Sequence, residues 1–239
     1  MLLRRSVYIA LLFLFIVSCK NEGEQAGVNI RGYLPELAGR VIYLEELEVR
    51  SKKMIDSTTI GEEGIFKFNL RVPEAGFYIL STSEQNQLIL QADKSETIEI
   101  STSNSDFSEG YTVSGSPGSE LLYSFEKALK ERKEQIDSLA EVYYAVRGTE
   151  DFLEKKAALD STYEAIVKDH KKYVEAFIRS HPGSLAALIV LNRPLGSTPL
   201  IDEEDDFRLF HITDSALRAN YPDNKHVEDH HRRTREIRL

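Results

Sequence analysis

The hydrophobic periodicity of this chain changes once, near Gly118, and the change divides the chain into two halves. Up to about Val113, short runs in which apolar and polar residues alternate are separated by turn residues. From Ser119 to His181 there is no proline and one glycine, Gly148, and apolar residues recur at three- and four-residue steps. The sequence therefore predicts an α+β protein: an antiparallel β-sandwich or barrel-like domain followed by an all-helical domain.

The first half contains seven strand candidates in which β-branched and aromatic residues dominate. Regular spacing with turn signals between the runs indicates an antiparallel sheet structure, and a closed barrel and an open sandwich both fit it. The candidates cover residues 28–33, 40–44, 53–60, 65–70, 76–80, 87–91 and 97–101.

The second half predicts a helical hairpin and then short helices. Ser119 is expected to cap the first long helix. Residues 148–150 read as the turn of the hairpin, and residues 181–183, His-Pro-Gly, end its second helix. The remaining helices are expected over residues 184–191, 202–219 and 222–237.

The N-terminus carries a targeting signal. Arg4 and Arg5 precede an apolar run over residues 7–17, which is too short for a membrane span of ~20 residues but suits a signal peptide. Residues 16–19, Ile-Val-Ser-Cys, resemble the lipobox of bacterial lipoproteins, so we expect cleavage before Cys19 and acylation of its sulfur. The alternative is a plain signal peptide that happens to end in Ser-Cys.

Charge and cysteine content exclude several functions. The net charge is −9, and it becomes −11 once Arg4 and Arg5 are removed, leaving 28 basic and 39 acidic residues. Because nucleic-acid binding depends on basic side chains that neutralise phosphates, we expect no nucleic-acid partner. The single cysteine excludes an intramolecular disulfide, a Cys-x-x-Cys redox pair and a zinc site built from several cysteines.

These signals predict four segments. They are a signal peptide over residues 1–18, a flexible tether over 19–27, a β domain over 28–116 and a helical domain over 117–239. A lipid anchor on Cys19 would place the protein in a bacterial cell envelope, at the outer membrane facing the periplasm. Residues 20–22, Lys-Asn-Glu, loosely resemble a surface-export signal, so display at the cell surface stays open.

The body of the chain resembles a known family. The stretches that carry the resemblance are residues 30–33, 41–44, 55–57, 64–68 and 113–116, together with 180–184 and 221–223. They resemble lipoproteins of Bacteroidetes that join a domain of unknown function, DUF4369, to a helical segment and then to a thioredoxin-like domain. The resemblance covers about residues 28–239 and implies a small β domain followed by a helical linker.

The same resemblance implies a thiol-disulfide oxidoreductase, but the residues for that reaction are absent. The family's catalytic domain carries Trp-Cys-x-x-Cys, whereas this sequence has no tryptophan and no cysteine besides Cys19. We therefore expect no catalytic residue and no cofactor. Two interpretations stay open: a non-catalytic lipoprotein that binds a protein partner or itself, and the targeting or substrate-docking half of an oxidoreductase, truncated from a longer gene. A nutrient-binding lipoprotein is a third class with little support.

Other motifs give weaker signals. His226 and His230 stand at i and i+4, but four arginines follow, so we expect a solvated terminal helix rather than a metal site. The run 202–206, Asp-Glu-Glu-Asp-Asp, lacks the spacing of a calcium loop and is read as the acidic start of a helix. Residues 115–119 are a junction between the halves rather than a G-x-S-x-G elbow. The tyrosines of the hairpin, at 143, 144, 163 and 173, are read as core or rim positions rather than as a ligand platform.

Overall fold

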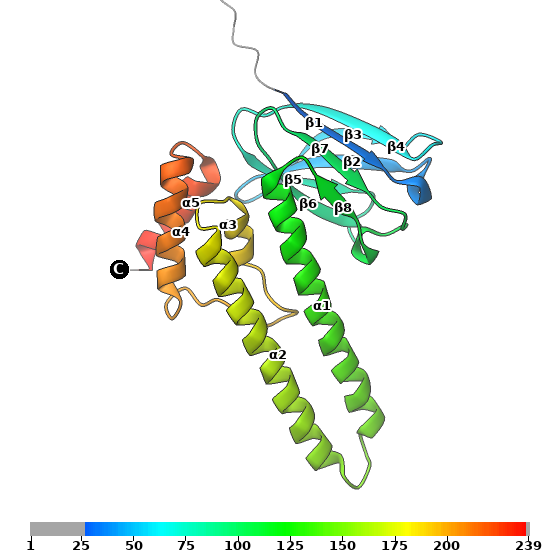
Figure 1. The fold of residues 1–239 in the computed structure, drawn as a ribbon, viewed down its shortest axis with the longest axis vertical. Coiled ribbons are helices and arrows are strands. Elements are labelled where there is room, and N and C mark those ends of the chain that lie inside the picture. Colours follow the sequence, from blue (N-terminus) through cyan, green and yellow to red (C-terminus); the bar gives the residue numbers. More distant parts are fainter. Residues whose placement is uncertain (1–26, 238–239) are drawn as a thin grey trace, which may run out of the picture.

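The computed structural model describes residues 27–237, so the predicted signal peptide, the tether up to residue 26 and Cys19 lie outside the described residues. Helices, with the short 3-10 helices included, account for 46% and strands for 24% of the described residues, which confirms the α+β class. A β part carries the first half of the sequence and a helical part the second (Figure 1). The strands are β1 (Gly27–Tyr33), β2 (Val41–Leu47), β3 (Lys52–Thr59), β4 (Ile65–Arg71), β5 (Gly76–Ser81), β6 (Gln87–Ala92), β7 (Thr97–Ser101) and β8 (Thr112–Ser114).

The β part is a pair of four-stranded sheets. One sheet has the strand order β4-β1-β7-β8 and the other β3-β2-β5-β6. Every predicted strand is present, and β8 is an additional short strand. The prediction of a purely antiparallel structure is wrong in one place, because β1 and β7 pair in parallel, with Ile30 opposite Ile98. The physical reason is that these strands lie far apart in sequence, so no hairpin turn fixes their relative direction.

Two hydrophobic cores share β5. The first lies in the β part and includes Ile30, Phe68 and Leu80. The second joins the other face of β5, through Phe77, to the helices, where Phe125 is fully buried. All six residues of β5 are consequently buried, as expected of a strand covered on both faces.

The helical part consists of a long hairpin and three shorter helices. Its elements are α1 (Pro117–Val146), α2 (Phe152–Ser180), α3 (Ala186–Leu191), α4 (Phe207–Asn220) and α5 (Lys225–Glu236). Gly148 lies in the turn between α1 and α2 with φ +92°, a conformation that favours glycine. The predicted cap Ser119 is wrong: Ser116 is the N-cap, and its Oγ accepts a hydrogen bond from the backbone N–H of Ser119. Pro117, which suits the first position of a helix, moves the start of α1 forward.

The start of α1 is bound tightly to β6. The hydroxyls of Ser116 and Ser119 both donate to the backbone carbonyl of Gln91, at 2.8 and 2.7 Å. A Cβ on Gly118 would lie 2.2 Å from the side-chain Cδ of Gln91, so any larger residue here would force the Gln91 side chain to move. These contacts fix the direction in which α1 leaves the β part.

The last helix, α5, is also docked on the β part. Asn224, the N-cap of α5, donates from Nδ2 to the backbone carbonyl of Ala75 at 2.6 Å. Lys225 pairs with Glu46, and His226 packs edge-on against Phe77. The expectation of a solvated terminal helix is therefore wrong, because the residues on one face of α5 are buried.

The observed start of α4 also differs from the predicted start of this helix. This helix begins at Phe207 rather than at Asp202, and residues 203–206 form turns before it. Within residues 27–237, none of the helices combines the length and the apolar character that crossing a bilayer requires.

Candidate functional site

The hairpin of α1 and α2 projects from the body of the protein (Figure 1). At its base, side chains of both helices join the second core, among them Leu122, Phe125, Val174 and Phe177. Along residues 130–169, which we call the stalk, no residue is buried. The stalk therefore buries its side chains less completely than the base of the hairpin does.

The two helices of the stalk meet along a heptad-like seam. The seam residues of α1 recur at alternating steps of three and four and those of α2 at steps of seven, which is the heptad spacing of a coiled coil. The half-buried apolar residues of the seam are Ile136, Leu139, Tyr143 and Val146 on α1, and Phe152, Leu159 and Ile166 on α2. With one partner helix each, these side chains stay partly in contact with water.

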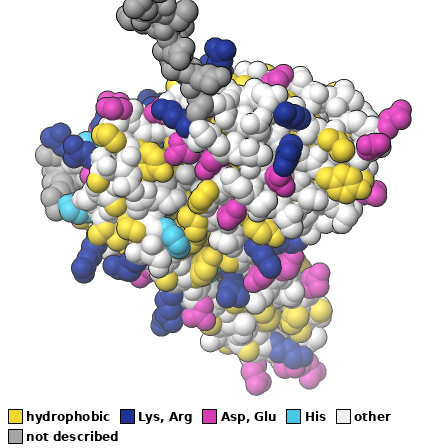
Figure 2. Space-filling model, turned by 45° about the horizontal axis from the view of Figure 1, so that its top comes forward, with side chains coloured by type: hydrophobic (Ala, Val, Ile, Leu, Met, Phe, Trp, Pro, Cys, Tyr) yellow, Lys and Arg dark blue, Asp and Glu magenta, His cyan; other side chains and the backbone are white. Residues whose placement is uncertain are grey.

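The far end of the stalk exposes large apolar side chains. Tyr143 packs edge-on against Phe152 and Tyr144. Tyr144 is nevertheless 69% exposed, Leu153 79% and Val142 47%. Hydrophobic and charged side chains lie together at the projecting lower end of the molecule in Figure 2. Exposed aromatic and aliphatic groups of this kind are typical of protein contact surfaces.

The seam enters the core at a buried histidine. His170 is fully buried between Phe125 and Tyr173, with its ring nearly parallel to that of Tyr173. Neither of its ring nitrogens has a hydrogen-bond partner among the described residues. Burial lowers the pKa of His170 below its ordinary value of 6.5, and nearby Arg132 lowers it further. Tyr173 is half-buried and packs against the second core, which confirms the core or rim interpretation for this tyrosine.

The connection between α3 and α4 braces one side of the hairpin. Arg193 pairs with Glu126 of α1 at 2.9 Å. Lys171 of α2 pairs with Asp206 at 2.8 Å, and the hydroxyl of Tyr163 hydrogen-bonds to that of Thr198 at 2.9 Å. Beyond this connection the two helices continue with no other element beside them (Figure 1).

The histidines that the sequence singled out serve packing. His226 packs against Phe77, and the Nε2 of His230 donates to the carbonyl of Phe210 at 3.2 Å. Burial lowers the pKa of both rings below the ordinary value. Residues 27–237 contain no group of three His, Cys, Asp or Glu side chains placed to hold a metal ion.

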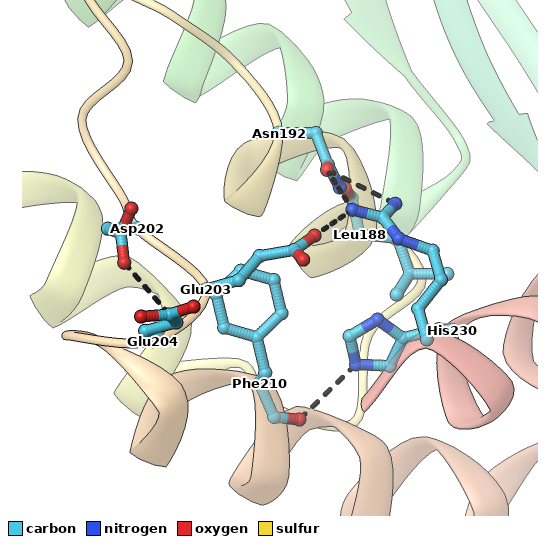
Figure 3. A network of polar contacts seen from close by, with 8 residues as sticks. Leu188, Asn192, Asp202, Glu203, Glu204, Phe210 and His230 are labelled. Carbon is cyan, nitrogen blue, oxygen red and sulfur yellow. Dashed lines mark hydrogen bonds and ion pairs between the residues drawn. The ribbon is translucent and has the colours of Figure 1, made fainter. Parts of the chain in front are cut away.

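The acidic run contacts one of the terminal arginines, Arg233 (Figure 3). The carboxylate of Asp202 accepts from the backbone N–H groups of Glu204 and Asp205, and these bonds hold its pKa below the ordinary value. Glu203 pairs with Arg233 of α5, which also reaches the side-chain oxygen of Asn192. The run is thus a structural turn tied to α5, a role its composition did not reveal.

Open hollows on the surface of the described chain include the following two. One of about 500 Å³ lies along the outer side of α5 beside Val49, and the charged side chains that line it include Lys225, Glu228 and Arg235. The other, of about 290 Å³, lies on the outer face of β1 and β7, where Arg31 pairs with Glu99.

The structure thus defines a class: an α+β protein with a two-sheet β part and a helical hairpin that stands free over most of its length. Residues 28–122 match the family described as "Domain of unknown function (DUF4369)". The match covers all eight strands and the first turn of α1, and it confirms the prediction of a DUF4369 domain in this region. None of the curated proteins matches the chain.

Proposed function

We propose that this protein is a non-catalytic lipoprotein of a bacterial cell envelope, anchored through Cys19, and that its hairpin is a docking arm for a protein partner, either a different protein or a second copy of this chain. The observation that carries the proposal is the stalk. It extends away from the body, buries none of its residues and ends in the exposed side chains of Val142, Tyr144 and Leu153. An exposed apolar end on a rigid arm is typical of an interaction surface.

The position of the first described residue supports this arrangement. Gly27 lies at the end of the molecule opposite the turn between α1 and α2 (Figure 1). The eight residue-to-residue steps from Cys19 to Gly27 can span at most ~3.6 Å each, so an anchor on Cys19 would hold the β part within ~30 Å of the bilayer. The tip of the hairpin stays clear of the anchor in this geometry.

The anchor is tested in cells that express the full chain. We expect a clickable fatty acid to label the chain and a Cys19→Ser variant to lose both the label and the membrane fraction. Labelling that persists in the Cys19→Ser variant, or a wild type without label, contradicts the anchor.

The docking arm is tested by photocrosslinking in the same cells. A crosslinking amino acid at position 144 or 153 is expected to give a discrete adduct, whereas the same group at Glu63, exposed in the turn before β4, gives none. Equal adducts at all three positions, or none at 144 and 153, contradict the docking role.

The second candidate is the targeting or substrate-docking half of a thiol-disulfide oxidoreductase. The match of residues 28–122 to DUF4369 favours it, because this domain is the part on which the resemblance to such enzymes rests. It requires a thioredoxin-like domain from a longer gene product or a partner. An adduct at position 144 that contains a Trp-Cys-x-x-Cys protein would support this candidate, and any other identified partner would exclude it.

A further inference from the structure

The charges of the hairpin are separated along its length. Residues 137–154, which we call the acidic tip, carry five carboxylates and one arginine, a net charge of −4. Residues 127–133 and 168–172, the basic collar nearer the body, carry seven basic and two acidic side chains, a net charge of +5. The hairpin is therefore negatively charged at its tip and positively charged near its base.

Many of these charges have no ion-pair partner within the described chain. In the acidic tip, the unpaired carboxylates are those of Asp137, Glu141, Glu150 and Glu154, while Asp151 pairs with Lys155 at 2.8 Å. In the basic collar, the lysines without an ion-pair partner among residues 27–237 are Lys127, Lys133 and Lys168. The unpaired lysines and the unpaired carboxylates of the two regions are free to bind a partner surface.

The seam needs more helices than the hairpin supplies. Its apolar side chains are only half-buried, and Tyr144 and Leu153 lie outside it and are exposed. Two hairpins side by side form a four-helix bundle, in which each seam is covered from a second side. Exposed alanines on the stalk, at 140, 145, 157, 158 and 165, allow the helices to approach closely.

The charges select the orientation of such a pair. In a parallel pair, acidic tip would face acidic tip. In an antiparallel pair the acidic tip of each copy faces the basic collar of the other, and the two-fold axis makes this contact twice. The tip surrounds the turn at Gly148, and the α1 part of the collar is centred on Lys130, so a two-fold axis near residue 139 of α1 places the tip of each copy opposite the collar of the other.

We propose that the hairpin binds the hairpin of a second copy of this chain, antiparallel, to form a four-helix bundle with each acidic tip on the partner's basic collar. This inference rests on the proposed function, because it names the partner of the same docking arm. With the anchors at the two far ends of the pair, the dimer lies along the bilayer.

Charge reversal in the full chain, purified in detergent, tests the proposal by sedimentation. The tip variant is Asp137→Lys, Glu141→Lys and Glu154→Lys, and the collar variant is Lys127→Glu, Lys133→Glu and Lys168→Glu. We expect a wild-type dimer, a dimer weakened about a hundredfold in either variant, and recovery when both sets are combined.

A matched control separates this effect from a general change in charge. The variant Glu36→Lys, Glu62→Lys and Glu63→Lys changes the net charge as much as the tip variant does, at exposed positions of the β part. It is expected to dimerise like the wild type. Far-UV circular dichroism of each variant verifies that the hairpin is folded.

Engineered disulfides give a second readout that does not depend on charge. Residues 27–237 contain no cysteine, so within this range an introduced cysteine can form a disulfide only with the cysteine introduced into the other copy. Glu154→Cys in one copy and Lys133→Cys in another are expected to form a mixed disulfide, while two copies of Glu154→Cys do not. The reverse result, or combined variants that fail to dimerise although folded, overturns the antiparallel pairing.

The outcomes distinguish the two proposals. A monomeric wild type at about 100 µM, a concentration that would populate any dimer of micromolar Kd, overturns the self-association. If position 144 still crosslinks to a different, identified protein, the docking arm survives with that protein as its occupant. A wild type that stays monomeric and gives no adduct at position 144 overturns both the self-association and the docking arm.

Discussion

Asn224 links the end of the chain to the β part, and its replacement by alanine should destabilise the protein measurably. Asn224 is 3% exposed, and its side chain makes three hydrogen bonds. Oδ1 accepts from the backbone N–H groups of His226 and Val227, and Nδ2 donates to the carbonyl of Ala75 at 2.6 Å. Loss of an N-cap costs about 1 kcal/mol. A buried carbonyl left without a partner costs about 1–3 kcal/mol more.

We therefore expect Asn224→Ala to lower the free energy of unfolding by about 2–4 kcal/mol. For a protein of this size, that corresponds to a fall in Tm of roughly 4–16 °C. Denaturant titration followed by circular dichroism measures the first quantity, and calorimetry the second. Asn224→Ser keeps the cap oxygen but removes the amide, so its cost should be intermediate.

Asn220 provides the matched control, because its Nδ2 donates to the carbonyl of Gly183 at 3.0 Å from an exposed position. Asn220→Ala is expected to cost no more than about 1 kcal/mol, since water replaces the lost bond. Equal losses at positions 220 and 224 would refute the argument that burial at the junction makes the contact costly.

Three further predictions concern the base of the hairpin. Phe125→Ala removes a fully buried ring from the second core and should cost about 3–5 kcal/mol in a denaturant titration. Gly118→Ala places a Cβ against the buried side chain of Gln91 and should cost about 1–3 kcal/mol in the same assay. Because burial lowers the pKa of His170 in the folded state, the unfolded chain binds more protons below the ordinary value of 6.5. The contribution of His170 is thus complete above pH 6.5 and is lost as the pH falls, and His170→Phe should reduce the loss of stability between about pH 7.5 and about pH 5.

The pattern of apolar, polar and turn residues along the chain predicted most of the strands and helices. Alternation and turn residues located seven of the eight strands, and β8 was missed because three residues are too short to show a period. The hairpin followed from the unbroken helical stretch and Gly148. The start of α1 was misplaced because Ser116 and Ser119 are both good caps, and the sequence does not show which of them precedes the first helical turn.

The candidate site was only partly predictable. The heptad spacing that makes the seam is present in the sequence, and so are the tyrosines at 143 and 144. Tyr144 and Leu153 are exposed because no other element covers the hairpin at their level. The connection between α3 and α4 determines how far along the hairpin the covering extends. The dense charge of α5 suggested solvation, whereas the helix docks through Val227, His230 and Thr234, two of which are polar.

Patterning along the chain was enough to predict the succession of strands and helices and the turn of the hairpin, because these features depend on residues that are neighbours in sequence. The three-dimensional fold was needed to reveal the parallel pairing of β1 with β7, the burial of both faces of β5, the docking of α5 and the length of hairpin left uncovered. Each of these depends on contacts between residues distant in sequence, whose free energies are set by burial and partner geometry rather than by local preference.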